Sequence, residues 1–260
     1  MSVLLFLIAV AASGIGAISG IGGGVIMKPL LDSTGMLTVW AATFMSGCTV
    51  LSMSAVSVVK NRKEIKNGNF KTLLFLSFGA ALGGILGKFL FQLAGQYFDN
   101  SALGITQSVI LIVMNLLVIF VTVLGSKRQR GRESGNLICL IAGLFLGITS
   151  AFLGIGGGPI NIAVLLLLLP VTQKRAAAGS LFIIFCSQLT SLISTLITGS
   201  LPEFRPVDLI VMCVGGIAGA FIGGAISSKI SEKSARRIFI AVTVLIMFVS
   251  VYNIIKFKFF

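Results

Sequence analysis

Long runs of apolar residues make up most of the chain, and short polar linkers separate them. A helix that crosses a membrane needs about 20 consecutive apolar residues. Eight runs reach or approach that length, at residues 2–20, 36–59, 70–92, 103–124, 135–155, 174–199, 206–229 and 237–255. Two shorter apolar stretches, 24–32 and 158–170, each follow a glycine cluster and are too short to span alone unless tilted. The pattern predicts an all-α polytopic membrane protein with about eight long helical segments and two short glycine-broken or re-entrant helices.

Composition excludes a water-soluble globule and a disordered chain. Of the 260 residues 56% are hydrophobic and 10% are charged, whereas soluble domains carry about 25% charged residues. The apolar runs leave no room for a domain outside the membrane. The first run lacks a basic start and a small-residue cleavage site, so it is expected to be a retained span and not a cleaved signal.

Charge is distributed unevenly over the linkers and predicts their orientation. The chain has 20 Lys and Arg against 7 Asp and Glu, and basic residues concentrate in linkers 60–71, 127–132 and 229–237. The linkers 93–102 and 200–208 carry little net charge. Because cytoplasmic loops are enriched in Lys and Arg, the basic linkers are expected inside and both termini outside the cytoplasm. No solvated face is large enough for nucleic acid, so the expected surroundings are membrane lipids, and a homo-oligomer is compatible with the sequence.

The chain repeats itself. The motif GIGGG occurs at 20–24 and again at 154–158, and each half later carries a glycine-spaced run, at 79–87 and at 215–224. The linkers that flank the matched elements have opposite charge patterns, which predicts an inverted-topology repeat, a plan common in secondary transporters. We expect an N-terminal repeat at 1–126, a basic cytoplasmic linker at 127–134 and a C-terminal repeat at 135–260.

Inversion requires an odd number of crossings in each half. The count works if the first long run and its short partner form either a re-entrant hairpin or two spans broken at the glycines. A plain model with eight spans stays open, but it would place one basic linker outside.

The two glycine clusters are candidate anion sites. Glycines would interrupt a membrane helix, and Pro159 suits the first turn of a new helix. A helix that begins inside the membrane presents free N–H groups and the positive end of its dipole, which favour an anion. The alternative is that these glycines only allow close helix packing, which is the favoured interpretation for the glycine-spaced runs.

Polar side chains within the apolar runs are costly in lipid and therefore candidates for a binding pocket. Serines and threonines often bond only to their own helix, and Lys28 and Lys88 could extend to the membrane surface; this alternative is favoured for Lys88. Asp32 and Asp208 lie near predicted span ends, so no proton relay of deep carboxylates is expected. The candidate substrate-binding residues are Gly22, Gly23, Gly24, Lys28, Thr43, Ser46, Gly156, Gly157, Gly158, Asn161, Ser180 and Gln188.

Nothing in the sequence indicates catalysis or a cofactor. The chain has no His, and its four cysteines lie in apolar runs without metal-ligand spacing. A nucleophile–base pair and an ATP-binding motif are also missing from the sequence. We therefore expect no enzymatic activity, no metal and no cofactor.

The paired GIGGG breaks, Pro29 after the first, the stretch GIGGGPIN after the second and the glycine-spaced third and seventh runs resemble the TauE/SafE sulfite exporter family. The resemblance covers nearly the whole chain. It implies export of small anions such as sulfite, sulfoacetate and related sulfonates or carboxylates across the inner membrane of a prokaryote. The alternatives are a permease for another small solute or a cation, and a membrane scaffold without transport.

Overall fold

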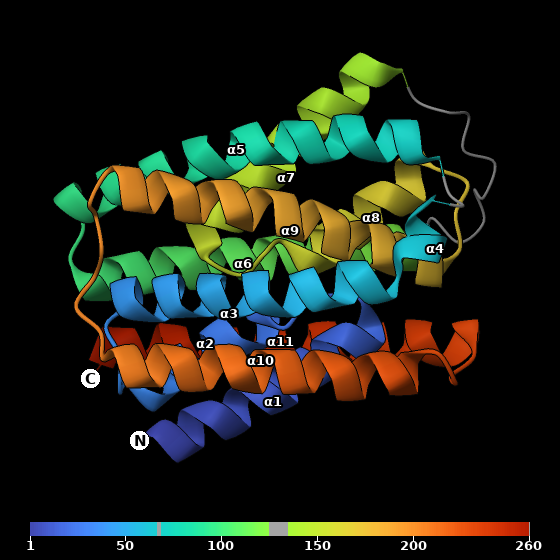
Figure 1. The fold of residues 1–260 in the computed structure, drawn as a ribbon. Helices are drawn as coiled ribbons and strands as arrows, with labels where there is room; N and C mark the ends of the chain where they lie inside the picture. The colour runs from blue at the N-terminus through green and yellow to red at the C-terminus, as the bar shows by residue number, and fades with distance from the viewer. Residues whose placement is uncertain (67–68, 125–134, 260) are drawn as a thin grey trace.

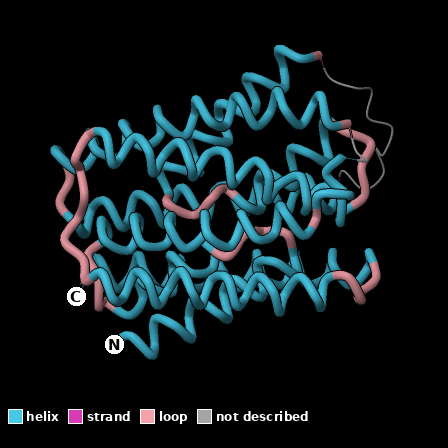
Figure 2. Tube along the Cα trace, viewed as in Figure 1, coloured by secondary structure: helices cyan, strands magenta, loops and turns pink. Residues whose placement is uncertain are grey.

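The computed structural model describes residues 1–66, 69–124 and 135–259, and all regular structure in these ranges is α-helical (Figure 2). Eight helices are long and apolar enough to cross a membrane. These are α1 (Ser2–Ser19), α3 (Val39–Lys60), α5 (Phe70–Tyr97), α6 (Asn100–Leu124), α7 (Asn136–Leu153), α9 (Gln173–Ile197), α10 (Pro206–Ser227) and α11 (Glu232–Phe259).

Two short helices follow the glycine clusters, as the sequence predicts: α2 (Gly24–Thr34) and α8 (Gly158–Leu168). A third short helix, α4 (Arg62–Lys66), lies in a basic linker and was not expected. The predicted class, a polytopic helical membrane protein, is confirmed. The predicted linker 127–134 lies outside the described residues, and the exact repeat boundaries stay a prediction.

The long helices run roughly side by side, and the linkers gather at the two ends of the bundle (Figure 1). Both chain ends and the turns after α5 and α9 lie at one end, here called the terminal face. The helix α4 and the turn between α10 and α11 lie at the opposite end, here called the basic face. Basic residues therefore collect at one end of the bundle, as the linker pattern predicts.

The pair α1–α2 is a re-entrant hairpin. Helix α1 starts at the terminal face, where the Ser2 hydroxyl donates to Asp208 at 2.6 Å. Helix α2 then turns back to the same face: Lys256, near the end of α11, donates to the carbonyl oxygen of Ser33 at 2.9 Å. Of the two alternatives for this segment, the structure contains the hairpin.

The pair α7–α8 forms the corresponding hairpin from the basic face. Helix α7 begins there (Figure 1). After α8, the chain returns to the same face at the start of α9, where Arg175 pairs with Glu64 of α4 at 3.5 Å. Each half thus combines one hairpin with three crossings, which gives the odd count that an inverted repeat requires.

The halves interlock through their glycine-spaced helices. Helix α5 packs mainly on α7 of the other half, and α10 packs mainly on α1. A Cβ atom added at Gly83 would lie against the Leu144 carbonyl, and one added at Gly219 would lie 2.5 Å from the Val10 carbonyl. Because glycine has no side chain, the two backbones approach closely without a hydrophobic driving force between them.

This packing predicts that Gly83→Leu destabilises the fold. The new side chain would meet the α7 backbone, which cannot move aside, so we expect the free energy of unfolding to fall by about 2 kcal/mol or more. Thermal unfolding of the purified protein measures the effect. Gly135→Ala is the control, because nothing lies within 4 Å of a Cβ atom there. Equal melting temperatures for both variants would contradict the packing role of Gly83.

Candidate functional site

Both glycine clusters interrupt their helices. Gly20 and Gly154 end α1 and α7 in the left-handed conformation, with φ of 74° and 65°. Gly22 and Gly156, in the middle of each break, have φ of 78° and 77°. Residues with a Cβ atom rarely adopt these angles. The glycines are therefore needed for the backbone conformation of the breaks, and both interruptions that the sequence predicts are present.

The two breaks lie against each other inside the bundle. A Cβ atom at Gly24 would be 2.5 Å from the Ile155 carbonyl oxygen, and one at Gly158 would overlap the Ile21 carbonyl oxygen. Ile21 and Ile155 are both buried. The first turns of α2 and α8 therefore meet near the centre, and the helices run from there toward opposite faces.

A small cavity lies beside the second break, between α3, α5, α7 and α9. It is on the terminal-face side of Gly154, because it extends to residues near the start of α3 and the end of α9. Its lining residues are Thr43, Phe44, Gly47, Cys48, Lys88, Ala151, Gly154, Gln188, Ser191, Leu192 and Thr195.

Lys88 is the one charged residue of this lining, and it is 4% exposed. Its ammonium lies 5.2 Å from the centre of the Phe91 ring. No ion pair joins it to a carboxylate among the described residues. An isolated buried charge is strongly unfavourable. The cavity next to Lys88 therefore suits a negatively charged ligand.

The sequence favoured a Lys88 side chain that extends to the membrane surface, and the structure differs. Helix α5 continues to Tyr97, beyond the predicted end of the apolar run at residue 92. Lys88 is therefore well inside the helix, and its side chain turns inward to the Phe91 ring. A lysine in the interior of a long, mainly apolar helix was the feature of the sequence that could have identified it.

Hydrogen-bonding groups line the rest of the cavity. The Thr43 hydroxyl is buried and has no hydrogen-bond partner in the part of the chain that the structure describes. The Gln188 amide donates to the Ser150 hydroxyl at 3.1 Å, and Ser150 lies 3.3 Å from the Ser187 hydroxyl. Of the predicted site residues, Thr43 and Gln188 line this cavity. Cys48, Ser191 and Thr195 also line it. The sequence analysis did not select them as site residues, because a single small polar residue in a membrane helix does not indicate whether it lines a cavity.

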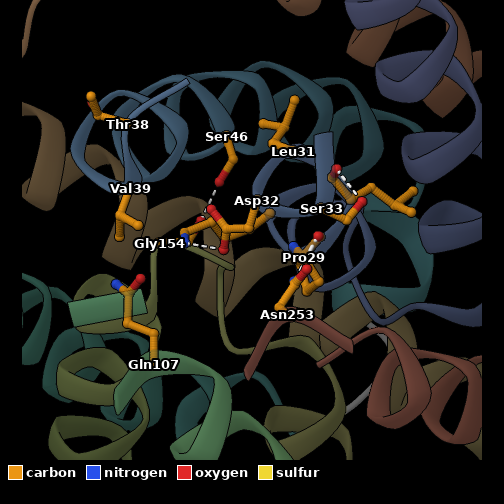
Figure 3. Close-up of polar contacts among 12 residues, drawn as sticks. Pro29, Leu31, Asp32, Ser33, Thr38, Val39, Ser46, Gln107, Gly154 and Asn253 are labelled. Carbon is orange, nitrogen blue, oxygen red and sulfur yellow. Dashed lines mark hydrogen bonds and ion pairs between the residues drawn. The ribbon is translucent and has the colours of Figure 1, made fainter. Parts of the chain in front are cut away.

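Other predicted residues bond the backbone of the breaks. The Ser46 hydroxyl donates to the Gly154 carbonyl at 2.5 Å (Figure 3). Ser180 donates to the Gly158 carbonyl at 3.4 Å, and the Asn161 amide donates to the Gly156 carbonyl at 3.4 Å. These side chains fix the shape of the second break, and the Asn161 oxygen has no partner.

The remaining predicted glycines are packed inside the bundle. Cβ atoms at Gly22 and Gly23 would meet Ile184 and Ser13. The Gly23 amide donates to the Met53 sulfur at 3.2 Å. Gly157 lies next to Ser150 and Asn161 in a left-handed conformation. The breaks and the Lys88 cavity are thus neighbours, joined through Gly154.

Lys28, also predicted, forms a buried ion pair with Asp32 one helical turn later. Its charge is therefore already compensated. Asp32 lies near the end of α2, as the sequence predicts, and it is nevertheless only 5% exposed. The reason is that α2 folds back into the bundle, which surrounds its last turns with other helices. Figure 3 shows Asp32 among the neighbouring polar groups.

The described residues contain no group of three or more metal-binding side chains. The site consists of a buried cation, hydroxyls and amides next to a broken helix. Such groups can bind and orient an anion, and no covalent chemistry follows from them.

The comparisons with known proteins agree with this geometry. The family model described as Sulfite exporter TauE/SafE matches residues 5–250. The chain is also 24% identical to the "Probable membrane transporter protein YunE" of Bacillus subtilis (strain 168), over 94% of this chain and 95% of that protein. The family match spans nearly the whole sequence, including both glycine breaks and all residues of the Lys88 cavity. This chain therefore belongs to the TauE/SafE sulfite exporter family.

Proposed function

We propose that this protein is a secondary transporter that exports small anions across the cytoplasmic membrane of a prokaryote. The name of the family supports sulfite as the cargo, and we extend the proposal to sulfoacetate and to related organosulfonates or carboxylates. The name of the relative supports membrane transport without naming a substrate. The observation that carries the proposal is Lys88, a buried ammonium that pairs with no carboxylate among the described residues and that lines a small cavity.

The cavity has the chemistry that a small oxyanion needs. The Lys88 ammonium supplies charge, and the unpartnered Thr43 hydroxyl supplies a hydrogen-bond donor. Gln188 and Ser191 add further polar groups to the wall. A buried positive charge repels cations, so a cation as cargo is disfavoured.

The hairpins supply the structural basis for alternating access. The two breaks meet at the centre, and each hairpin opens toward a different face of the bundle. Rocking of one repeat against the other would expose the central region first to one side and then to the other. With the basic face in the cytoplasm and both termini outside, an inside-negative potential drives an anion toward the terminal face.

Lys88→Met is expected to abolish anion binding. In the wild type, an anion present at about 100 times its dissociation constant should stabilise the fold by about 2.7 kcal/mol, seen as a rise in melting temperature. The variant should show no such rise with sulfite, sulfoacetate, isethionate or acetate, because the compensating cation is gone. Lys60→Met is the matched control: Lys60 also lies over a phenylalanine ring, at 5.5 Å from the Phe221 centre, but is exposed. Stabilisation of Lys88→Met equal to that of wild type would refute the proposed site.

Cys48 lines the same cavity and offers an independent test of its charge. In a variant that keeps only this cysteine, an anionic thiosulfonate reagent should label it about tenfold faster than a cationic one, because the local potential concentrates anions. Sulfite or isethionate should slow the labelling by occupying the cavity. Mass spectrometry of the intact protein measures the rates, and Cys48→Ala in the same background is the control. A faster reaction with the cationic reagent would count against an anion site.

A further inference from the structure

A second small cavity lies between α2, α6 and the end of α7. It contains the buried ion pair of Lys28 and Asp32, whose side chains are 3% and 5% exposed. Gln107 and Ser108 of α6 form part of the opposite wall. The mechanism above does not use this ion pair, although burying two charges is costly and needs a reason.

Two oxygen atoms of residues that line this cavity accept no hydrogen bond from any described residue. They are Oδ1 of Asp32 and Oε1 of Gln107, and both are buried. Buried polar atoms nearly always have a partner, so exceptions indicate a missing ligand or a functional role. The missing partner must be a donor. A proton on Oδ1 would convert Asp32 from an acceptor into a donor.

The charges around Asp32 favour a proton over a metal cation. The charged side chains that act on it are Lys28 on its own helix and Lys256 on α11. Helices α1, α6, α7 and α8 carry no charged side chain in their described ranges, and α3 carries only Lys60, at its far end. Two lysines repel an added metal ion. A metal ion would also need several oxygen ligands, whereas a proton needs one.

The two cavities share a wall. Ala151 and Gly154 face the Lys88 cavity, whereas Leu153 and Ile155, in the same short segment, face the Asp32 cavity. A charge in one cavity interacts electrostatically with a charge in the other, because the wall is thin and the surroundings have a low dielectric constant.

A chain of contacts also crosses this wall. The Gln107 amide donates to the Phe152 carbonyl at 2.8 Å. The Phe152 ring packs edge-on against Phe91, with ring centres 6.0 Å apart. Phe91 in turn carries the Lys88 ammonium over its ring at 5.2 Å. A change in hydrogen bonding at Gln107 can therefore reach Lys88 through two packed residues, Phe152 and Phe91.

We propose that Asp32 binds the coupling proton of this transporter, and that one proton accompanies each anion held at Lys88. The proton comes from water, binds Oδ1 of Asp32 and changes the net charge of the pair from zero to +1. That charge compensates one negative charge of the anion, and both leave together on the other side. The inference rests on the proposed function. With a divalent anion such as sulfite, one negative charge stays uncompensated, and the membrane potential favours export. With a monovalent sulfonate or carboxylate the step is electroneutral, so the concentration gradients of the anion and the proton set its direction instead of the membrane potential.

Because proton binding and anion binding affect each other, the proposal can be tested by binding measurements on the purified protein, without a transport assay. If a proton favours the anion, then the anion favours the proton by the same factor. Isethionate serves as the probe, because a sulfonate does not titrate in mildly acidic or mildly alkaline buffer. Binding to the purified wild type should be about tenfold tighter in the acidic buffer. Addition of isethionate to weakly buffered protein should also take up one proton per bound anion, read with a pH indicator.

Three variants separate this role from a structural one. The double variant Lys28→Gln/Asp32→Asn removes both charges together, so no unpaired buried charge remains. It should still bind isethionate, but without proton uptake and with equal affinity in both buffers. Asp32→Asn alone should do the same if it folds. Asp208→Asn is the control, because Asp208 is also buried near the terminal face, where it bonds Ser2, and it should keep the wild-type proton uptake.

Each outcome has a distinct meaning. Proton uptake that persists in the double variant would overturn the assignment to Asp32. Isethionate binding by the wild type without proton uptake would overturn coupling while leaving the proposed function intact. If no anion of the panel binds the wild type in either buffer, the proposed function itself fails.

Discussion

Direct backbone contact between two broken helices is the constraint on which this structure depends. The carbonyls of Ile21 and Ile155 occupy the space that Cβ atoms at Gly158 and Gly24 would need. Only glycine permits this contact and the left-handed angles around it. Backbone of this kind is tolerated at membrane depth only where protein or a cavity surrounds it. The two hairpins therefore depend on the central backbone contact, and the irregular backbone of the breaks depends on the protein and the cavity that surround it.

The two halves share the order of their long helices and their hairpins, but they differ in chemistry. Gly223 corresponds to Gly87, so the position of Lys88 is taken by Gly224 in the second half. Likewise, Ile162 and Leu166 stand where the first half has Lys28 and Asp32. The repeat supplies two equivalent hairpins, whereas the buried charges occur once. Two equivalent hairpins allow the protein to open toward either face, whereas charges present in one half give it a single site for its cargo.

Much of the fold was predictable because its causes are local. The lengths of the apolar runs give the eight long helices, and the GIGGG motifs give the two breaks. The partners of the glycine-spaced helices were not predictable: a small-residue face shows that a helix packs closely, but not on which segment. The site was predictable only in part. Thr43 and Gln188 stood out as polar residues in lipid, whereas the burial of Lys88 depends on Phe91 and on the extension of α5 to Tyr97.

The exchange of helices between halves has a consequence for how the protein is made. Helix α1 packs mainly on α10, which the ribosome synthesises much later. The glycine face of α5 likewise packs on α7, which is synthesised after it. The nascent N-terminal half therefore enters the bilayer with its α1 contact surface uncovered. Lipid can cover this apolar surface in the meantime, so the packing of α1 is completed only after α10 has been synthesised, when most of the chain is already in the membrane.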